Sequence, residues 1–287
     1  MEKFIMQKWM EYSSDLHFVA GQITRDGKLL FIETELTELD FFERPVPKSN
    51  WTVRIMDGDK IETIELKNVP LIPTEIDLFT DGTLLIVQGR CLKDGNFIER
   101  NARRYNPNGQ LMEAFALGDG ISKVQIDESN TIWVSYFDEG IFGNCGWDEP
   151  MGSSGLVAYS SSGEKLWGAD EYGICDTYAL NVQSSKEVYF YYYDDFYLVK
   201  LADRVEESRH RIEGENTLDQ FIVAEEELIA QVDINTLMRY QKRKYTYKPK
   251  EKLILLDEKG QRILGDIFMR GRYIYAIGKN AIYRREF

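Results

Sequence analysis

Histidine is nearly missing from this chain, and its scarcity argues against several kinds of catalytic site. His17 and His210 are the only two histidines among the 287 residues. His17 precedes the first predicted strand, and we place His210 at the rim of the fold, in the charged stretch ESRHRIEG. No histidine pair has metal-motif spacing, and no HExxH or GxSxG motif occurs. The sequence therefore argues against a Ser-His-Asp or Cys-His mechanism, which needs a histidine beside a nucleophile.

Cysteine is scarce too, which argues against a disulfide framework. Cys91, Cys145 and Cys175 are odd in number and lack CxxC spacing, so they predict neither a set of disulfides nor a zinc knuckle. Cys145 lies between Asn144 and Gly146 with no basic residue adjoining it, so we expect an unreactive thiol.

Long hydrophobic runs and an excess of positive charge are also absent. No apolar run approaches the roughly 20 residues that cross a membrane. Gln7, Lys8 and Glu11 interrupt the N-terminal stretch where a signal peptide would have its apolar core. The net charge of -13 disfavours nucleic acid and anionic membranes as partners, although ordinary solubility also accounts for it. We expect a cytoplasmic protein.

Aromatic residues and tight-turn residues are plentiful, and they recur in a fixed order. The 17 Tyr and 15 Phe suit pleated strands. One hairpin pattern occurs as GQITRDGKLLFIE, IDLFTDGTLLIVQ and VQIDESNTIWVSY, with fainter copies from Asn181, Phe221 and Ile267. A second hairpin pattern occurs as ARRYNPNGQLMEAF, LVAYSSSGEKLWG and LILLDEKGQRILG. Gly27, Gly82 and Asn130 occupy the turns of the first pattern, where a positive φ is favoured.

The two hairpins alternate, and this alternation predicts an all-β fold, a six-bladed β-propeller in a single domain over residues 1–287. The four-stranded units begin near residues 17, 74, 122, 178, 218 and 266. Their average length of about 45 residues is typical of propeller blades. The last unit is one strand short, and an N-terminal strand at about residues 4–12 can complete it and close the ring.

In this register the chain resembles bacterial six-bladed propeller proteins, including NHL-like and SMP-30/gluconolactonase-like proteins. The resemblance covers nearly the whole chain and depends on the pattern of strands and turns. It implies the fold, and among the lactonases a divalent metal held in the central channel by Glu, Asn and Asp. Propellers carry many unrelated functions, so the resemblance does not choose one.

Insertions in the predicted blades collect on one face of the ring. They occupy the connections between second and third strands, the B–C loops, at residues 34–50, 91–101, 137–154 and 233–250. The fourth blade is the exception, because Asp194 and Asp195 form a tight turn there. Insertions confined to one face of a repeat protein usually mark its binding face, although tolerated decoration is the alternative.

The third of these loops contains the candidate binding residues, Trp147, Phe142, Asp148, Glu149, Asn144 and Asp138. Aromatic rings beside acidic and amide groups suit sugar stacking or a protein contact, and the alternative is that they anchor the loop on its blade. The carboxylates could bind a hard cation such as Ca²⁺ or simply be solvated.

A repeated position on the predicted innermost strands is polar. It holds Gln22, Asp77, Gln125 and Asn181, and with Glu75, near the start of its strand, these are the candidate channel-lining residues. These side chains either line an axial channel or form hydrogen bonds between blades, as buried polar groups usually do.

The last insertion includes a basic, tyrosine-containing run, MRYQKRKYTYKPK, from Met238. We expect it to pair with acidic neighbours or to dock an acidic partner, rather than to bind nucleic acid.

Two main hypotheses of function follow. The first is a binding or interaction module that presents the long B–C loops to a protein or small-molecule partner and needs no cofactor. The alternative is a metal-assisted hydrolase, lactonase- or glycosidase-like, that uses a calcium-like divalent ion and carboxylates at the channel mouth. A structural subunit of a larger assembly is a third possibility, and it predicts an exposed apolar patch above about 600 Å².

Overall fold

Alternating apolar and polar residues between tight turns produce a fold made almost entirely of β-strands. The computed structural model describes residues 2–214, 217–234 and 236–287. Within that part of the chain the helices are α1 (Asp138–Phe142) and the 3₁₀ helix η1 (Asp170–Tyr172). The predicted turns are confirmed: Gly27 has a φ of 86° and Asn130 a φ of 63°. None of the described helices is of a length and hydropathy that would cross a membrane.

Residues 16–177 form a compact unit, here called the central unit. It contains three four-stranded antiparallel sheets. The first consists of β3 (His17–Ile23), β4 (Leu29–Thr34), β5 (Ser49–Asp57) and β6 (Lys60–Val69). The second consists of β7 (Glu75–Leu78), β8 (Leu84–Val87), β11 (Ala102–Tyr105) and β12 (Leu111–Phe115). The third consists of β13 (Ile121–Ile126), β14 (Ile132–Tyr136), β15 (Leu156–Tyr159) and β16 (Lys165–Gly168).

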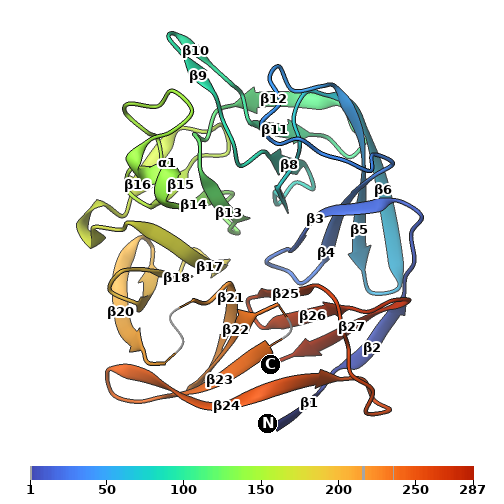
Figure 1. Ribbon diagram of the computed structural model, residues 1–287, viewed down its shortest axis with the longest axis vertical. Helices are drawn as coiled ribbons and strands as arrows, with labels where there is room; N and C mark the ends of the chain where they lie inside the picture. The colour runs from blue at the N-terminus through green and yellow to red at the C-terminus, as the bar shows by residue number, and fades with distance from the viewer. Residues whose placement is uncertain (1, 215–216, 235) are drawn as a thin grey trace. The chain divides into compact units, whose positions relative to one another are not determined.

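Within the central unit the first strands of the three sheets lie side by side, because β7 contacts both β3 and β13 (Figure 1). A large apolar cluster fills the space between the first two sheets, with Trp51, Leu66, Ile76 and Ile86 among its buried members. Successive four-stranded sheets that meet at their first strands are the arrangement of propeller blades.

Residues 1–15 and 178–287 form a second compact unit, here called the terminal unit. One of its sheets consists of β25 (Ile267–Arg270), β26 (Tyr273–Ile277), β27 (Ala281–Glu286) and β2 (Gln7–Glu11). The N-terminal strand β2 pairs antiparallel with β27, so the predicted completion of the last sheet is confirmed.

The other sheet of the terminal unit has nine strands. Two antiparallel series form it: β17 (Asp176–Ser184), β18 (Glu187–Tyr193), β19 (Tyr197–Ala202) and β20 (Val205–Ile212), then β21 (Gln220–Ala224), β22 (Glu227–Asp233), β23 (Thr236–Lys242) and β24 (Thr246–Leu256). The two outermost strands, β20 and β24, join the series by parallel pairing of Arg211 with Thr246 and of Ile212 with Tyr247. The ninth strand, β1 (Glu2–Ile5), pairs with the other end of β24.

The strands therefore confirm an all-β, propeller-like arrangement but not six separate blades. Four of the expected blades are separate four-stranded sheets, whereas the fourth and fifth share one sheet. The cause is the length of β24: its 11 residues reach β20 at one end and β1 at the other.

The predicted insertion at 233–250 is wrong. These residues belong largely to β23 and β24, which form a hairpin around residues 243–245. The basic side chains of Lys248 and Lys250 are exposed, while Tyr247 faces the interior. This arrangement is that of a strand with one side in solvent. The segment LILL, which the sequence predicted as the third strand of its blade, is therefore the end of β24.

Candidate functional site

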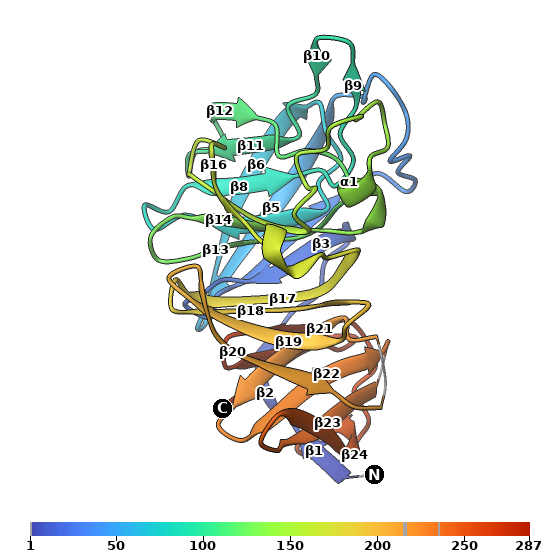
Figure 2. The ribbon, with the colours of Figure 1, turned by 90° about the vertical axis from the view of Figure 1, so that its left-hand side faces the viewer.

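Three long connections of the central unit lie on one side of it. They are residues 35–48 between β4 and β5, residues 88–101 between β8 and β11, and residues 137–155 between β14 and β15. The second includes the short hairpin of β9 (Lys93–Asp94) and β10 (Phe97–Ile98). Figure 2 shows β9, β10 and α1 on the same side of the unit, opposite the turn between β13 and β14. We call these three connections together the loop layer.

Polar contacts join the loops to one another. Arg44 of the first loop forms an ion pair of 3.0 Å with Glu99 of the second. The backbone N–H of Lys93 donates to the carbonyl of Cys145 at 2.9 Å and connects the second loop to the third. Gly146 follows with a φ of 84°, and a Cβ on it would overlap the carbonyl of Lys93. The three loops therefore pack together as one structure and are not independent of one another.

Arg90 lies at the centre of the layer, with only 12% of its side chain exposed. Its guanidinium nitrogen lies 3.1 Å from Oδ2 of Asp119, which is buried, and it also binds Glu139 of α1. It donates to the Sγ atom of Cys145 at 3.1 Å. The sequence missed this neighbour of Cys145, because Arg90 and Cys145 are 55 residues apart.

The charges around Arg90 affect the two carboxylates differently. Burial raises the pKa of Asp119, against the opposing effect of the Cys91 N–H, which donates to Oδ1 at 2.7 Å, and of Arg90. The hydrogen bond from Arg90 lowers the pKa of the exposed Glu139. Arg90 therefore pairs with the buried carboxylate of Asp119, outside the three loops, and holds α1 through the exposed carboxylate of Glu139.

The aromatic side chains of the third loop divide into two groups. Trp147 is buried, donates from Nε1 to the carbonyl of Cys91 at 2.7 Å, and has the Lys93 ammonium 5.2 Å from its ring centroid. Trp147 therefore anchors the loop, which was the alternative to a role in binding. Phe142 is 68% exposed. The other candidates of this loop are exposed, namely Asp138, Asn144, Asp148 and Glu149.

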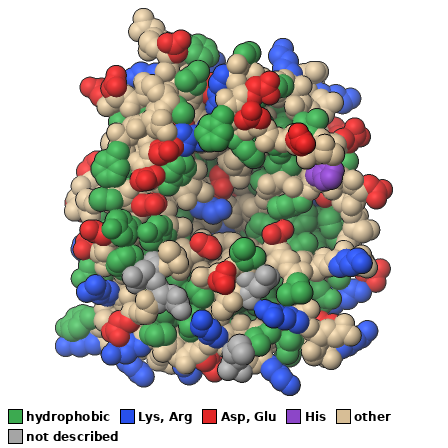
Figure 3. Space-filling view, viewed as in Figure 1, with side chains coloured by type: hydrophobic (Ala, Val, Ile, Leu, Met, Phe, Trp, Pro, Cys, Tyr) green, Lys and Arg blue, Asp and Glu red, His purple; other side chains and the backbone are tan. Residues whose placement is uncertain are grey.

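Each loop also presents an exposed phenylalanine. Phe42 of the first loop is 72% exposed, Phe97 of the second is 61% exposed and Phe142 belongs to the third. The guanidinium of Arg90 lies 5.6 Å from the ring centroid of Phe42. Exposed carboxylates surround these rings in sequence, at Glu38, Asp40, Glu43, Asp94, Asp138, Asp148 and Glu149. Figure 3 shows hydrophobic and acidic side chains interspersed on the face that this view presents.

The polar residues of the inner strands bind the main chain of neighbouring strands. In the central unit, Gln22 donates to the carbonyl of Val124 at 3.0 Å, and Glu75 accepts from its N–H at 3.3 Å. Asp77 accepts from the N–H of Ile126 at 2.6 Å. These contacts favour the alternative in which the polar groups connect sheets.

The remaining inner-strand candidates are also buried. Gln125 is 2% exposed. In the terminal unit, Asn181 donates to the carbonyl of Phe221 at 2.6 Å and accepts from the N–H of Gly271 at 2.9 Å. Burial raises the pKa of Glu75, which also lies 3.6 Å from the ammonium of Lys123. No three His, Cys, Asp or Glu side chains are grouped to hold a metal ion anywhere in the described chain.

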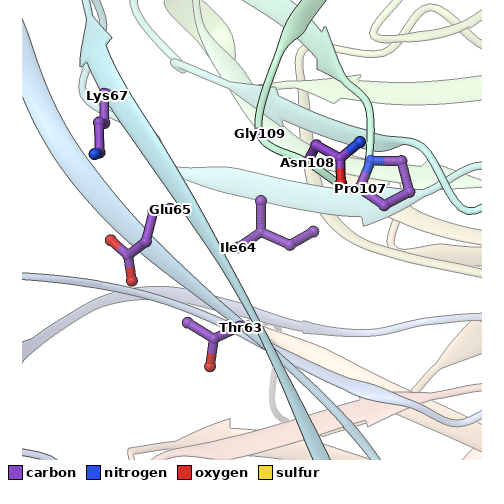
Figure 4. A pocket seen from close by; sticks show the side chains of 7 residues that line it. All are labelled: Thr63, Ile64, Glu65, Lys67, Pro107, Asn108 and Gly109. Carbon is purple, nitrogen blue, oxygen red and sulfur yellow. The ribbon is translucent and has the colours of Figure 1, made fainter.

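A pocket of about 410 Å³ lies elsewhere in the central unit, between β6 and the turn at residues 107–109. Figure 4 shows Ile64 directed toward this turn, while Thr63 and Glu65 point to the other side of the strand. Glu65 is already hydrogen-bonded to Thr52 at 3.1 Å. Lys67 and Asn108 are the other polar side chains of the lining, and the pocket lies away from the loop layer, so we do not assign the site to it.

Comparison with known proteins supports the fold. The virginiamycin B lyase of Staphylococcus aureus is similar in structure, with a TM-score of 0.52, 12% identity and coverage of 97% of this chain and 99% of that one. A streptogramin B lyase has a TM-score of 0.51 and 10% identity, with 96% of each chain covered. Both have a β-propeller fold, and at these identities the likeness shows the fold alone.

Similarity at the level of sequence covers less of the chain than the structural similarity does. A family model described as the YxzG family matches residues 152–285, which is just under half of the chain. No curated protein matches the sequence.

Proposed function

We propose that the chain is a binding module, a six-unit β-propeller scaffold whose loop layer docks a protein partner. One observation carries the proposal: three exposed phenylalanines, Phe42, Phe97 and Phe142, come from three separate loops that are held together by direct contacts. Large aromatic side chains on a pre-organised surface are the usual centres of protein interfaces. The count of six follows if each half of the nine-stranded sheet is one unit, since each half has four consecutive strands.

The charge around the rings indicates the chemistry of the partner. Exposed carboxylates flank the rings on all three loops, and examples are Asp40, Asp94 and Asp148. An acidic rim favours a partner that surrounds an apolar centre with Lys and Arg, because complementary charges speed association and fix orientation. We therefore propose a basic protein as the partner, and we expect salt to slow the association.

The test uses a variant of the full chain with Phe42→Ser, Phe97→Ser and Phe142→Ser. All three rings are exposed, so the variant should fold with an unchanged melting temperature. The matched control is Leu111→Ser with Met112→Ser on β12, where the side chains are 48% and 56% exposed. Proteins captured from a cell extract by the wild-type chain are purified, and their affinity for each variant is measured by calorimetry.

The proposal predicts a captured basic protein whose affinity falls at least about 100-fold with the three serines and is unchanged in the control. A captured protein that binds both variants equally well, or that is acidic, overturns the proposal.

The alternative hydrolase needs carboxylates that converge on a metal ion. Its inner-strand candidates Glu75 and Asp77 already accept hydrogen bonds from the main chain of β13, so the loop layer is the better supported site. Thermal melting with EDTA and then with Ca²⁺, Mn²⁺, Mg²⁺ or Zn²⁺ separates the two functions. A bound ion at about 100 times its dissociation constant adds roughly 2.7 kcal/mol of stability, and a rise of that size with one ion would favour the hydrolase.

A further inference from the structure

We propose that a pocket inside the nine-stranded sheet of the terminal unit binds a neutral, sugar-sized polyhydroxy molecule. The pocket has a volume of about 440 Å³, within the usual range of small-molecule sites. One wall comes from β18, β19 and β20, and the other from the ends of β21, β23 and β24. It adjoins the apolar cluster that contains Leu198, Tyr240 and Tyr247, so a packed core supports its floor.

Four side chains of this pocket have hydrogen-bonding groups without a protein partner. Tyr247 is only 3% exposed, yet its hydroxyl makes no hydrogen bond with any described residue. The hydroxyls of Tyr189 and Ser208 and the ring nitrogens of His210 are likewise unpaired within the described chain. None of these atoms is among the sealed, unpaired polar atoms of the described chain, so they are open to water or to a ligand in the pocket.

The protonation of these groups makes them suited to hydroxyl partners. Burial raises the pKa of Tyr189 to about 12 and also raises that of Tyr247, so both phenols stay protonated and can donate as well as accept. Burial and the nearby Lys242 lower the pKa of His210, and a neutral imidazole offers one donor and one acceptor. The ligand therefore needs groups that both donate and accept, as sugar hydroxyls do.

The charges of the pocket do not favour an anion. Lys200 is paired with Glu207 at 2.7 Å, and the other charged residues of the lining are Lys242, Glu187 and Glu225. Two lysines and three glutamates line the pocket, so a phosphate or sulfate would meet a small negative excess.

Aromatic surfaces supply the apolar contact that a sugar ring requires. The rings of His210 and Tyr247 meet edge to face, with centroids 5.5 Å apart, and Tyr189 lies beneath the ammonium of Lys200 at 5.8 Å. The C–H face of a pyranose can lie on the half-buried ring of Tyr189 or His210 while its hydroxyls reach the surrounding polar groups. A neutral monosaccharide combines both properties.

The test is binding of a panel of neutral monosaccharides to the full chain, measured by saturation-transfer NMR and then by titration. The panel contains glucose, galactose, mannose and N-acetylglucosamine, with glucose 6-phosphate and inorganic phosphate as charged probes. Tyr247→Phe removes one hydroxyl and keeps the ring, so affinity should fall about tenfold. Tyr245→Phe is the matched control, because Tyr245 is 67% exposed in the adjoining turn. Ser208→Ala on β20 is a second variant with a small structural effect.

The expected result is saturable binding of at least one neutral sugar, weakened by Tyr247→Phe and by Ser208→Ala but not by Tyr245→Phe. Absence of sugar binding at tens of millimolar overturns the proposal, as does tighter binding of glucose 6-phosphate than of glucose. Sugar binding that is unaffected by both pocket variants also overturns it. The variant with three loop-layer serines should bind the sugar normally, so the sugar-site proposal and the loop-layer proposal can be refuted independently.

Discussion

At the scale of single residues, Arg90 determines how the loop layer holds together. Its side chain reaches Asp119, which follows β12, Glu139 of α1 and Cys145 of the third loop. A planar guanidinium with five donors suits a position that several acceptors surround. Replacing it should affect the fold of the layer as well as its charge.

We expect Arg90→Met to lower the free energy of unfolding by about 3 kcal/mol, because it leaves the buried carboxylate of Asp119 without its cation. Urea denaturation measures the change. The control is Lys8→Met, which removes the cation of an exposed ion pair with Glu11. It should leave the urea midpoint of unfolding unchanged. Equal stability of Arg90→Met and the wild type would contradict a structural role for Arg90.

A second prediction at this scale concerns Asp176. Burial and the charge of Asp138 raise its pKa from 3.8 to about 6. The folded state therefore holds this proton more tightly than the unfolded state. The stability that this proton confers is complete below about pH 4 and is lost as the pH rises through about 6.

We therefore expect Asp176→Asn to raise the melting temperature relative to the wild type at pH 7.5 and to leave it unchanged near pH 4. Asp138→Asn should give part of the same gain, because it removes the second cause of the shift. Asp148→Asn, at an exposed position of the same loop, is the control. A gain of equal size at both pH values would rule out titration of Asp176 as the cause.

Some of these residues could be predicted from the sequence and others could not. Trp147 and Phe142 stand out because aromatic residues in a long acidic loop must either anchor it or face outward. The sequence does not separate the two cases, since the partner of Trp147 is the carbonyl of Cys91, 56 residues away. Arg90 belongs to no motif, and its role depends on contacts that only the folded chain brings together.

At the scale of elements, α1 lies directly against the segment that enters β13. Gly120 has a φ of 68°, and a Cβ on it would overlap the backbone nitrogen of Gly140 in α1. Gly173 has a similar φ of 60° but open space around it. Comparing Gly120 with Gly173 therefore separates the effect of backbone conformation on stability from the effect of close packing.

We expect Gly120→Ala to lower the free energy of unfolding by about 3 kcal/mol or more, since it adds a steric overlap to the unfavourable φ. Gly173→Ala should lose only about 1 kcal/mol, the cost of the conformation alone. Urea denaturation of both variants measures the difference. Similar losses would show that α1 can move away from Gly120 without cost.

The strands themselves were largely predictable, because alternation of apolar residues and glycine turns is local information. Pairing between distant strands was not. Thr246 and Tyr247 lie beside Arg211 and Ile212, and no local pattern signals this parallel contact. The basic, tyrosine-containing run from Met238 suggested a loop, although most of its residues belong to β23 and β24.

At the scale of the whole molecule, the same four-stranded meander is used in both compact units. The proposed protein-binding surface belongs to the central unit and the proposed sugar site to the terminal unit. The N-terminal segment stabilises the terminal unit in two places, because β1 pairs with β24 and β2 pairs with β27. Phe4 of β1 and Met6, which lies between β1 and β2, are 1% and 0% exposed.

Replacing both apolar residues, Phe4→Ala with Met6→Ala, should therefore open the edges of β24 and β27. Deleting large buried side chains costs about 2–5 kcal/mol each, so we expect the amides of these two strands to exchange at least about 100-fold faster. Hydrogen exchange followed by mass spectrometry measures this effect by peptide. Lys3→Ala with Gln7→Ala changes exposed positions of the same segment and should leave exchange unaltered. Because the packing of Phe4 and Met6 lies within the terminal unit, peptides of β13 and β14 should keep their protection, and an equal loss there would contradict this assignment.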